Sequence, residues 1–226
     1  MSRYAVIDFE TTGLSPGHGA RPTEIAVVLV DGGKIADRYQ SLMNPGVSIP
    51  HEIQVLTGIS NAMVRTAPRV EAVMGEAVDF VGDRPMLAHH AAFDRKFWET
   101  ELRRIGRWQE RDFACSLLLS RRIFPEAPNH KLGTLVRMLR LPAVERFHRA
   151  LADAEATAHL LLRIRQELQQ RFRLTAVSHE LLIAIQSASR SQLEECIQKH
   201  RPLSRGLTST SAGSAQTGHP GQPVLK

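Results

Sequence analysis

The sequence predicts an α/β fold in which a mixed sheet carries helices on both faces. Short apolar runs come first and alternate with turn residues, and later runs alternate with segments of helical spacing. The first pattern favours an antiparallel hairpin, and the second favours parallel strands joined by helices. A length of 226 residues suffices for one domain of ordinary size plus an appendage.

The antiparallel part comes from the first three strands. Residues 4–9 form a short apolar run, and residues 24–30 and 34–43 are rich in residues that favour strands. The segment Asp31-Gly32-Gly33 separates the last two runs. This turn chemistry is typical of a β-hairpin.

The remaining elements alternate. Buried strands are expected at residues 85–89 and 113–115, and a long amphipathic helix at 150–172. Three further segments with helical spacing of their apolar residues are 70–81, 93–105 and 131–139, and the strand end at 113–115 leads into residues 117–124.

The chain is expected to divide into three parts. Residues 1–173 form the main domain, and residues 174–201 form a helical extension, because apolar residues recur at helical spacing within 178–199. Residues 202–226 are mostly Ser, Thr, Gly, Gln and Pro, which bury little, so this tail is expected to be disordered. A chain ending near Arg173 is expected to keep its chemistry.

Composition narrows the class of protein. The first residues lack the basic region and cleavage site of a secretion signal, and no segment is apolar enough to span a bilayer, so we expect a cytoplasmic protein without a membrane partner. Cys115 and Cys196 lie far apart and indicate neither a disulfide nor a thiolate metal site. The net charge of +6 suits a polyanionic partner, although solvated arginines on helix faces explain pairs such as Arg121-Arg122 equally well.

Two acids close the first strand. Asp8 and Glu10 are two residues apart, so their side chains project from the same face. Two carboxylates this close repel each other unless a cation lies between them, and hard oxygen ligands suit Mg²⁺ or Mn²⁺. Taken alone, the pair can also be two solvated acids.

Three later features each have an ordinary explanation on their own. The segment Thr11-Thr12-Gly13-Leu14 is either a simple turn or a turn whose hydroxyl and N–H groups hold a terminal nucleotide. Asp94 lies in a first helical turn, where an acid favours the helix dipole. Asp153 follows His148 by five residues at the start of the long helix, where a histidine is usually a packed or surface residue.

In order, D-x-E-T-T-G at Asp8, H-H-A-A-F-D ending at Asp94 and H-x₄-D at His148 resemble the DEDDh branch of the DEDD exonuclease superfamily. That branch has a ribonuclease H-like fold and includes the proofreading subunit of bacterial replicative polymerases. The resemblance covers nearly all of residues 3–171. It implies a metal-dependent 3′–5′ exonuclease that releases nucleoside 5′-monophosphates from single-stranded or frayed DNA ends, in proofreading or repair.

The resemblance also implies residue roles. His148 would be the general base, since histidine titrates near physiological pH. The ligands of two Mg²⁺ or Mn²⁺ ions would be Asp8, Glu10, Asp94 and Asp153, with Asp8 bridging. The residues that grip the terminal nucleotide would be Thr11, Thr12, Gly13, Leu14, His89 and Phe93.

One position departs from the family pattern. His90 stands where Asn is common, which puts in doubt any polar contact made by that Asn. Thr57 and Gly58 are weaker candidates for the site, because a turn followed by a helix cap explains them as well.

Two alternatives stay open. The enzyme can instead act on short RNA or tRNA ends, since no residue in the sequence indicates whether a 2′-hydroxyl is accepted or rejected. A non-catalytic module that binds a polymerase or nucleic acid would be marked by loss of a catalytic position, and none of the five is lost. The extension can dock a DNA polymerase subunit or pack on its own domain.

Overall fold

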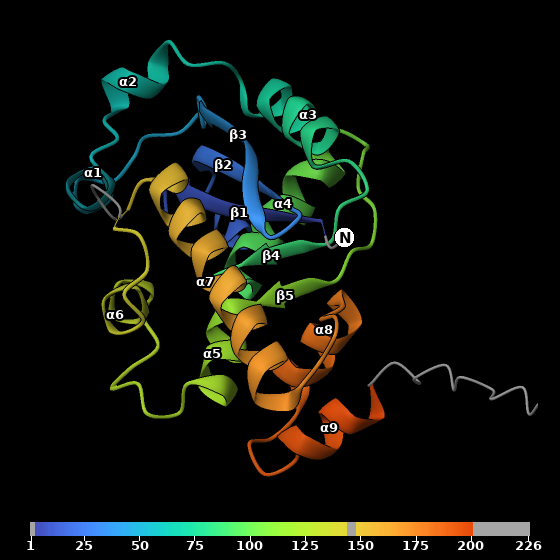
Figure 1. Ribbon diagram of the computed structural model, residues 1–226. Helices are drawn as coiled ribbons and strands as arrows, with labels where there is room; N and C mark the ends of the chain where they lie inside the picture. The colour runs from blue at the N-terminus through green and yellow to red at the C-terminus, as the bar shows by residue number, and fades with distance from the viewer. Residues whose placement is uncertain (1–2, 144–147, 201–226) are drawn as a thin grey trace, which may run out of the picture.

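The computed structural model describes residues 3–143 and 148–200, which form a five-stranded sheet with the order β3-β2-β1-β4-β5 (Figure 1). Strands β1 to β3 pair antiparallel, and β1, β4 and β5 pair parallel, so the predicted mixed sheet is confirmed. The strands are β1 (Tyr4–Thr11), β2 (Pro22–Asp31), β3 (Lys34–Leu42), β4 (Met86–Ala88) and β5 (Phe113–Cys115).

The predicted hairpin joins β2 to β3. Gly32 and Gly33 have φ angles of 57° and 82°, a left-handed conformation that glycine adopts without a steric penalty. Strand β2 is buried along almost its whole length, whereas β3 is the largely exposed edge strand. The hairpin therefore places an inner strand directly beside β1.

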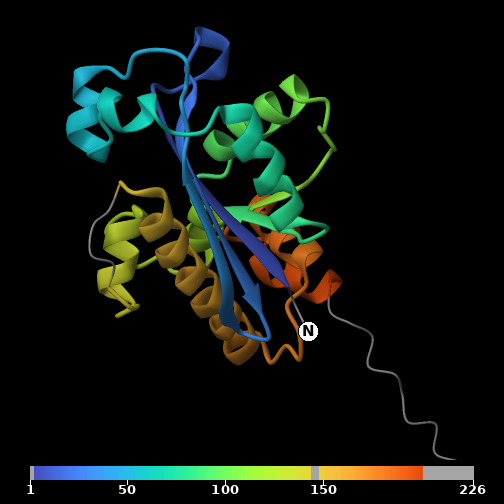
Figure 2. The same cartoon turned by 90° about the horizontal axis from the view of Figure 1, so that it is seen from above.

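Helices cover both faces of the sheet, as Figure 2 shows from above. Helices α3 and α4 pack on one face, and α5 to α9 contribute to the apolar cluster on the other. The helices are α1 (His51–Thr57), α2 (Asn61–Arg65), α3 (Val70–Val81), α4 (Ala92–Arg104), α5 (Ser116–Ile123), α6 (Leu132–Met138), α7 (Ala150–Phe172), α8 (His179–Ser187) and α9 (Leu193–Lys199), and a 3₁₀ turn spans Pro16–His18.

Helices α1 and α2 were not predicted. They have 7 and 5 residues, too few for apolar residues to establish a helical period. In Figure 1, α1 lies at the end of the sheet where α7 begins. This places α1 beside the residues with predicted chemistry.

The alternation of side chains along β1 sets the direction of its two acids. Ile7 belongs to the cluster under α3 and α4, whereas Tyr4 and Val6 belong to the cluster under α7. Since alternate residues share a face, Asp8 and Glu10 continue the face that α7 covers. The pairing of β1 with β2 shifts register directly after Glu10, so the strand is irregular where the acids end.

The C-terminal segment differs in detail from the single helical stretch expected for residues 178–199. It forms two helices, α8 and α9, and Leu182 and Ile185 of α8 are fully buried in the same cluster as α7. The Gln186 side chain also completes the edge of β5, because its Oε1 accepts from the Cys115 N–H at 2.6 Å and its Nε2 donates to the Phe113 carbonyl at 3.2 Å.

These contacts favour the alternative in which the extension packs on its own domain. The boundary at residue 173 stays a prediction, and the predicted tail, 202–226, lies outside the described residues. Cys115 and Cys196 are both free thiols. Within residues 3–143 and 148–200, no helix combines the length and apolar character needed to cross a bilayer.

Candidate active site

Four carboxylates and a histidine converge at one end of the sheet. Asp8 and Glu10 come from the end of β1, Asp94 from the first turn of α4, and Asp153 from the first turn of α7. All four, together with His148, line one cavity of about 350 Å³. The structure therefore brings together every acid and the histidine that the sequence singled out.

Local hydrogen bonds fix two of these acids. The Phe9 N–H donates to Asp94 Oδ1 at 3.2 Å, which ties α4 to β1 beside Asp8. The His148 N–H donates to Asp153 Oδ2 at 2.9 Å, and His148 has a φ of 62°, an uncommon left-handed conformation for a residue with a side chain. The turn before α7 thus aims the histidine and the acid at the same point.

A buried ion pair anchors that turn to the sheet. Glu24 of β2 is 0% exposed, and its carboxylate accepts from Arg149 Nη2 at 2.7 Å, from Arg149 Nε at 3.1 Å and from the Ala150 N–H at 3.0 Å. It therefore satisfies a free N–H at the start of α7. Sequence reasoning did not assign this role, although an acid at the start of an apolar strand was an available signal.

The acids carry a high electrostatic cost. Burial, followed by the charges of Asp153 and Glu24, raises the pKa of Glu10 to about 8. Burial is also the main cause that raises the pKa of Asp8 and of Asp94 well above the usual range of a carboxyl. A positive charge at this point would relieve the cost.

The cluster fits a hard divalent cation. Ligand atoms of Glu10, His148 and Asp153 all lie within 4.8 Å of one another. Asp153 Oδ1 is buried and has no hydrogen-bond partner, although a buried acceptor normally has one. Carboxylate oxygens in this number suit Mg²⁺ or Mn²⁺.

Apolar residues, two threonines, a glycine and two further histidines form the rest of the cavity wall. Leu14 is 83% exposed and Leu56 is 48% exposed, so both present exposed apolar surface at the site. The predicted binding residues that line the cavity are Thr11, Gly13, Leu14, His89 and Phe93. Two residues of the unpredicted helix α1, Ile53 and Leu56, line it as well, as does the weaker candidate Thr57.

Thr12 is placed differently. It is 8% exposed and does not line the cavity, and its hydroxyl accepts from the Arg21 N–H at 3.0 Å. The Thr12 N–H in turn donates to the Arg21 carbonyl at 2.9 Å. These bonds brace the turn that carries Thr11 and Gly13.

His89 is held by protein groups on both ring nitrogens. Nε2 lies 3.1 Å from the His130 carbonyl, which only accepts, so Nε2 carries the proton and Nδ1 accepts from the Ser116 hydroxyl at 2.9 Å. Burial lowers the pKa of His89 to about 4, so the ring is neutral at physiological pH. Both ring nitrogens are thus bonded within the protein, and the residue still lines the cavity.

The backbone at His90 explains the departure noted in the sequence. His90 has a φ of 65°, in the left-handed region where Asn, Asp and His are enriched among residues with a side chain. Both Asn and His can therefore form this turn between β4 and α4.

A mixed sheet with four convergent carboxylates and a histidine at its end is the arrangement of a metal-dependent nuclease. Residues 5–161 match the family model described as Exonuclease, and the chain belongs to that family. This confirms the resemblance found in the sequence motifs.

Similar proteins carry related names. The chain is 37% identical over 171 residues to a PolC-type DNA polymerase III of Halalkalibacterium halodurans, covering 75% of this chain and 12% of that protein. It is 40% identical over 172 residues to the 3′-5′ exonuclease DinG of Bacillus subtilis, covering 74% of this chain and 18% of that protein. The chain thus spans only a small part of the curated relatives it matches.

Solved structures agree on the fold. Exonuclease X in complex with 5′ overhanging duplex DNA superposes with a TM-score of 0.64 at 28% identity, covering 81% of this chain and 99% of that one. Escherichia coli Exonuclease I in complex with a dT13 oligonucleotide gives a TM-score of 0.66 at 18% identity, covering 76% of this chain and 43% of that one, which supports the fold alone.

Proposed function

We propose that this chain hydrolyses single-stranded or frayed DNA from its 3′ end and releases nucleoside 5′-monophosphates. One observation carries the proposal. Asp8, Glu10, Asp94, His148 and Asp153 line one cavity, and the wall facing them offers apolar contact from Leu14, Ile53, Leu56 and Phe93. Such a cavity suits one terminal nucleoside, with its phosphate at the acids.

In the proposed reaction, the four carboxylates would hold two divalent cations, Mg²⁺ or Mn²⁺. When bound, these ions neutralise the phosphodiester charge and promote ionisation of the attacking water. His148 accepts the proton of that water, and its left-handed backbone and the bond from its N–H to Asp153 hold the ring at the site. The Glu24–Arg149 pair keeps this turn in place.

The terminal nucleoside is held by contacts that read no particular base. Leu14 and Leu56 offer apolar surface, and the neutral ring of His89 offers a stacking face. Thr11 Oγ1 is already bonded to the Gly13 carbonyl at 2.6 Å, so its hydroxyl oxygen is left to accept. We keep Thr11 and Gly13 as proposed contacts of the terminal sugar.

The preference for DNA over RNA is part of the proposal. It is supported by relatives named as a DNA polymerase and a 3′-5′ exonuclease. An exoribonuclease acting on short RNA or tRNA ends remains the second candidate, while a non-catalytic binding module is disfavoured because all five catalytic positions meet at one site. A polymerase as partner and a place in the cytoplasm, in proofreading or repair, are proposed on the same relatives.

The test is digestion of 5′-labelled substrates with Mg²⁺, Mn²⁺ or EDTA. Single-stranded DNA, duplex DNA with a mismatched 3′ end, and RNA of the same sequence are compared. We expect a ladder that shortens from the 3′ end, faster on DNA, and no cleavage in EDTA. A labelled mononucleotide as the first product would refute the polarity, and full activity after exhaustive chelation would refute the metal requirement.

A further inference from the structure

A second cavity begins at the catalytic residues and leads away from the nucleoside cavity. It has a volume of about 800 Å³. The residues that line both cavities are Asp8, His89, His90, His148 and Asp153. The catalytic centre therefore lies where the two cavities meet.

The walls of the larger cavity come from α5, α6 and the link between them. Arg121 lies on α5, Lys131 directly before α6 and Arg137 on α6. Figures 1 and 2 both show α6 beside α7, and the two helices are in contact. Away from the catalytic acids, the lining thus contains three cations.

Within residues 3–143 and 148–200, no acidic side chain pairs with any of these three cations. All three side chains are exposed, and among the described residues none of them forms an ion pair or a side-chain hydrogen bond. Apart from Asp8 and Asp153, no described acidic residue lines this cavity. By contrast, Arg149 beside the same centre is paired with Glu24. The cavity therefore presents positive charge that the protein leaves available for an anion.

In the geometry of the proposed reaction, one anion can occupy the larger cavity and pair with its three cations: the nucleic acid strand itself. If the terminal nucleoside occupies the smaller cavity and its phosphate lies at the acids, the strand on the 5′ side must leave through the other opening. Each nucleotide of that strand carries one phosphate, and cationic side chains bind phosphates by releasing counterions. Leu117 and Leu132 in the same wall offer apolar contact to sugars or bases.

We propose that Arg121, Lys131 and Arg137 bind the phosphates of the nucleotides that precede the scissile bond. The larger cavity is thus the channel for the single strand, and this inference rests on the proposed function. The three cations bind substrate without touching the reacting atoms. They set the affinity for strands longer than one nucleotide and leave the chemistry at the acids unchanged.

The first test measures binding without cleavage. A 5′-fluorescein oligothymidylate is titrated in EDTA and followed by fluorescence anisotropy over a range of salt concentrations. The test protein is the triple variant Arg121→Ala, Lys131→Ala, Arg137→Ala. Three phosphate contacts to a single strand contribute about 2 to the slope of log Kd against log salt. Between about 50 and 200 mM salt, the wild-type Kd should therefore rise about 20-fold more than that of the variant.

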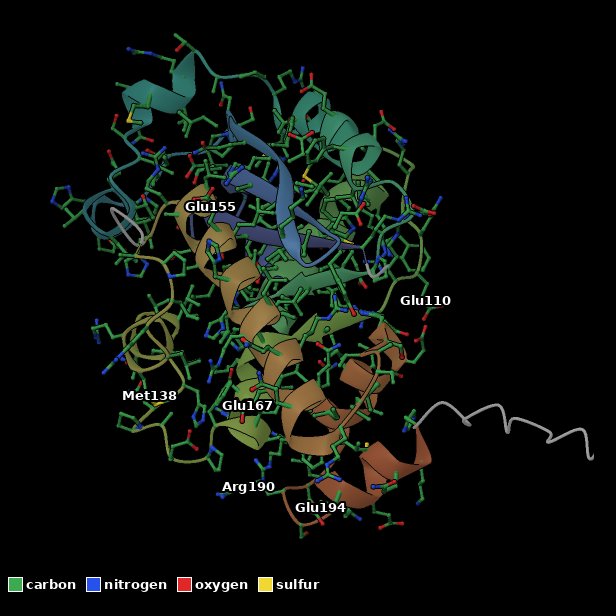
Figure 3. All side chains as sticks on the ribbon, viewed as in Figure 1. Glu110, Met138, Glu155, Glu167, Arg190 and Glu194 are labelled. Atoms are coloured by element: carbon green, nitrogen blue, oxygen red, sulfur yellow. The ribbon has the colours of Figure 1, made fainter. Side chains whose placement is uncertain are left out.

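Two control proteins separate charge at this site from charge in general. The first carries Arg121→Lys, Lys131→Arg and Arg137→Lys, which keep the charge, and it should retain most of the wild-type slope. The second removes three exposed cations that line neither active-site cavity: Lys34, Arg171 and Arg190. Figure 3 shows Arg190 well apart from Met138, the last residue of α6. This second control should also keep the wild-type slope.

The second test separates this inference from the proposed function. The p-nitrophenyl ester of thymidine 5′-monophosphate has a terminal nucleotide and no upstream phosphate. The alanine triple variant should cleave this ester at the wild-type rate while its KM for the oligothymidylate rises. An unchanged salt slope in the variant overturns the proposal, and so does an equal loss of ester cleavage. If the wild-type protein cleaves neither substrate, the proposed function fails, and the binding slope still decides the strand channel.

Discussion

The replacement Glu10→Gln tests whether buried carboxylates are what the metal must neutralise. Because burial and Asp153 raise the pKa of Glu10 from 4.5 to about 8, the metal-free folded protein holds a proton that the unfolded chain releases. A carboxyl whose pKa is raised by folding contributes its full stability only below the unfolded pKa of 4.5. That contribution is lost as the pH rises through the folded pKa of about 8. Gln cannot ionise, so the variant should not show this loss.

The size of the effect follows from the shift. At about 1.4 kcal/mol per pKa unit, a pKa that moves from 4.5 to about 8 corresponds to about 3.5 kcal/mol between about pH 5 and about pH 8. Partial exposure of the Glu10 side chain reduces the expected loss to about 2–3 kcal/mol. Asp8 and Asp94 add to the pH dependence of both wild type and Glu10→Gln. The contribution of Glu10 is therefore the difference between the stability losses of these two proteins.

The assay is urea denaturation in EDTA at about pH 5 and about pH 8. Glu126→Gln, which removes an exposed acid from the link between α5 and α6, is the matched control and should behave as wild type. Adding Mn²⁺ at the higher pH should raise the free energy of unfolding of wild type more than that of Glu10→Gln. If wild type and Glu10→Gln lose equal stability between the two pH values, folding does not raise the pKa of Glu10 as inferred.

Three further predictions concern the rest of the site and its support. His148→Ala should keep Mn²⁺ and oligonucleotide binding while turnover falls about 10²- to 10⁴-fold. Asp8→Ala should instead weaken Mn²⁺ binding itself, as measured by calorimetry. If His148→Ala turns over at close to the wild-type rate, His148 is not the general base. Leu182 is fully buried, so Leu182→Ala should lower the free energy of unfolding by about 2–5 kcal/mol. Ending the chain at Arg173 should lower this free energy further. An unchanged urea midpoint in both proteins would show that α8 is dispensable. Glu24→Gln should lower stability by about 1–3 kcal/mol and turnover together, and a stability loss with wild-type turnover would confine this residue to a structural role.

The sequence was most informative where structure is local. The apolar period of residues 70–81 and 150–172 predicted the bounds of α3 and α7, and the glycines after Asp31 predicted the hairpin. These features depend on neighbours a few residues apart, so a short window of sequence contains their cause. Helices α1 and α2 have too few residues for such a period, and they were missed.

The active site divides in the same way. The order of the motifs, through the family resemblance, predicted that the four acids and His148 would form one site, and the structure places all five in one cavity. Motif order could not show that Thr12 turns toward Arg21, or that Ile53 and Leu56 of α1 complete the cavity. Those contacts join segments separated by loops whose paths no local pattern specifies.

The amino-acid sequence by itself thus determined the fold class and the family, and it predicted which five residues would meet at one site, since each inference rests on local periodicity or on motifs in order. Only the tertiary structure decided that Glu24 anchors the start of α7, that the neutral ring of His89 is held at both nitrogens, and that two cavities meet at the acids. Glu24 and Arg149 are 125 residues apart in the chain. Such contacts form only when packing of the whole core brings distant segments together, and no window of sequence contains that information.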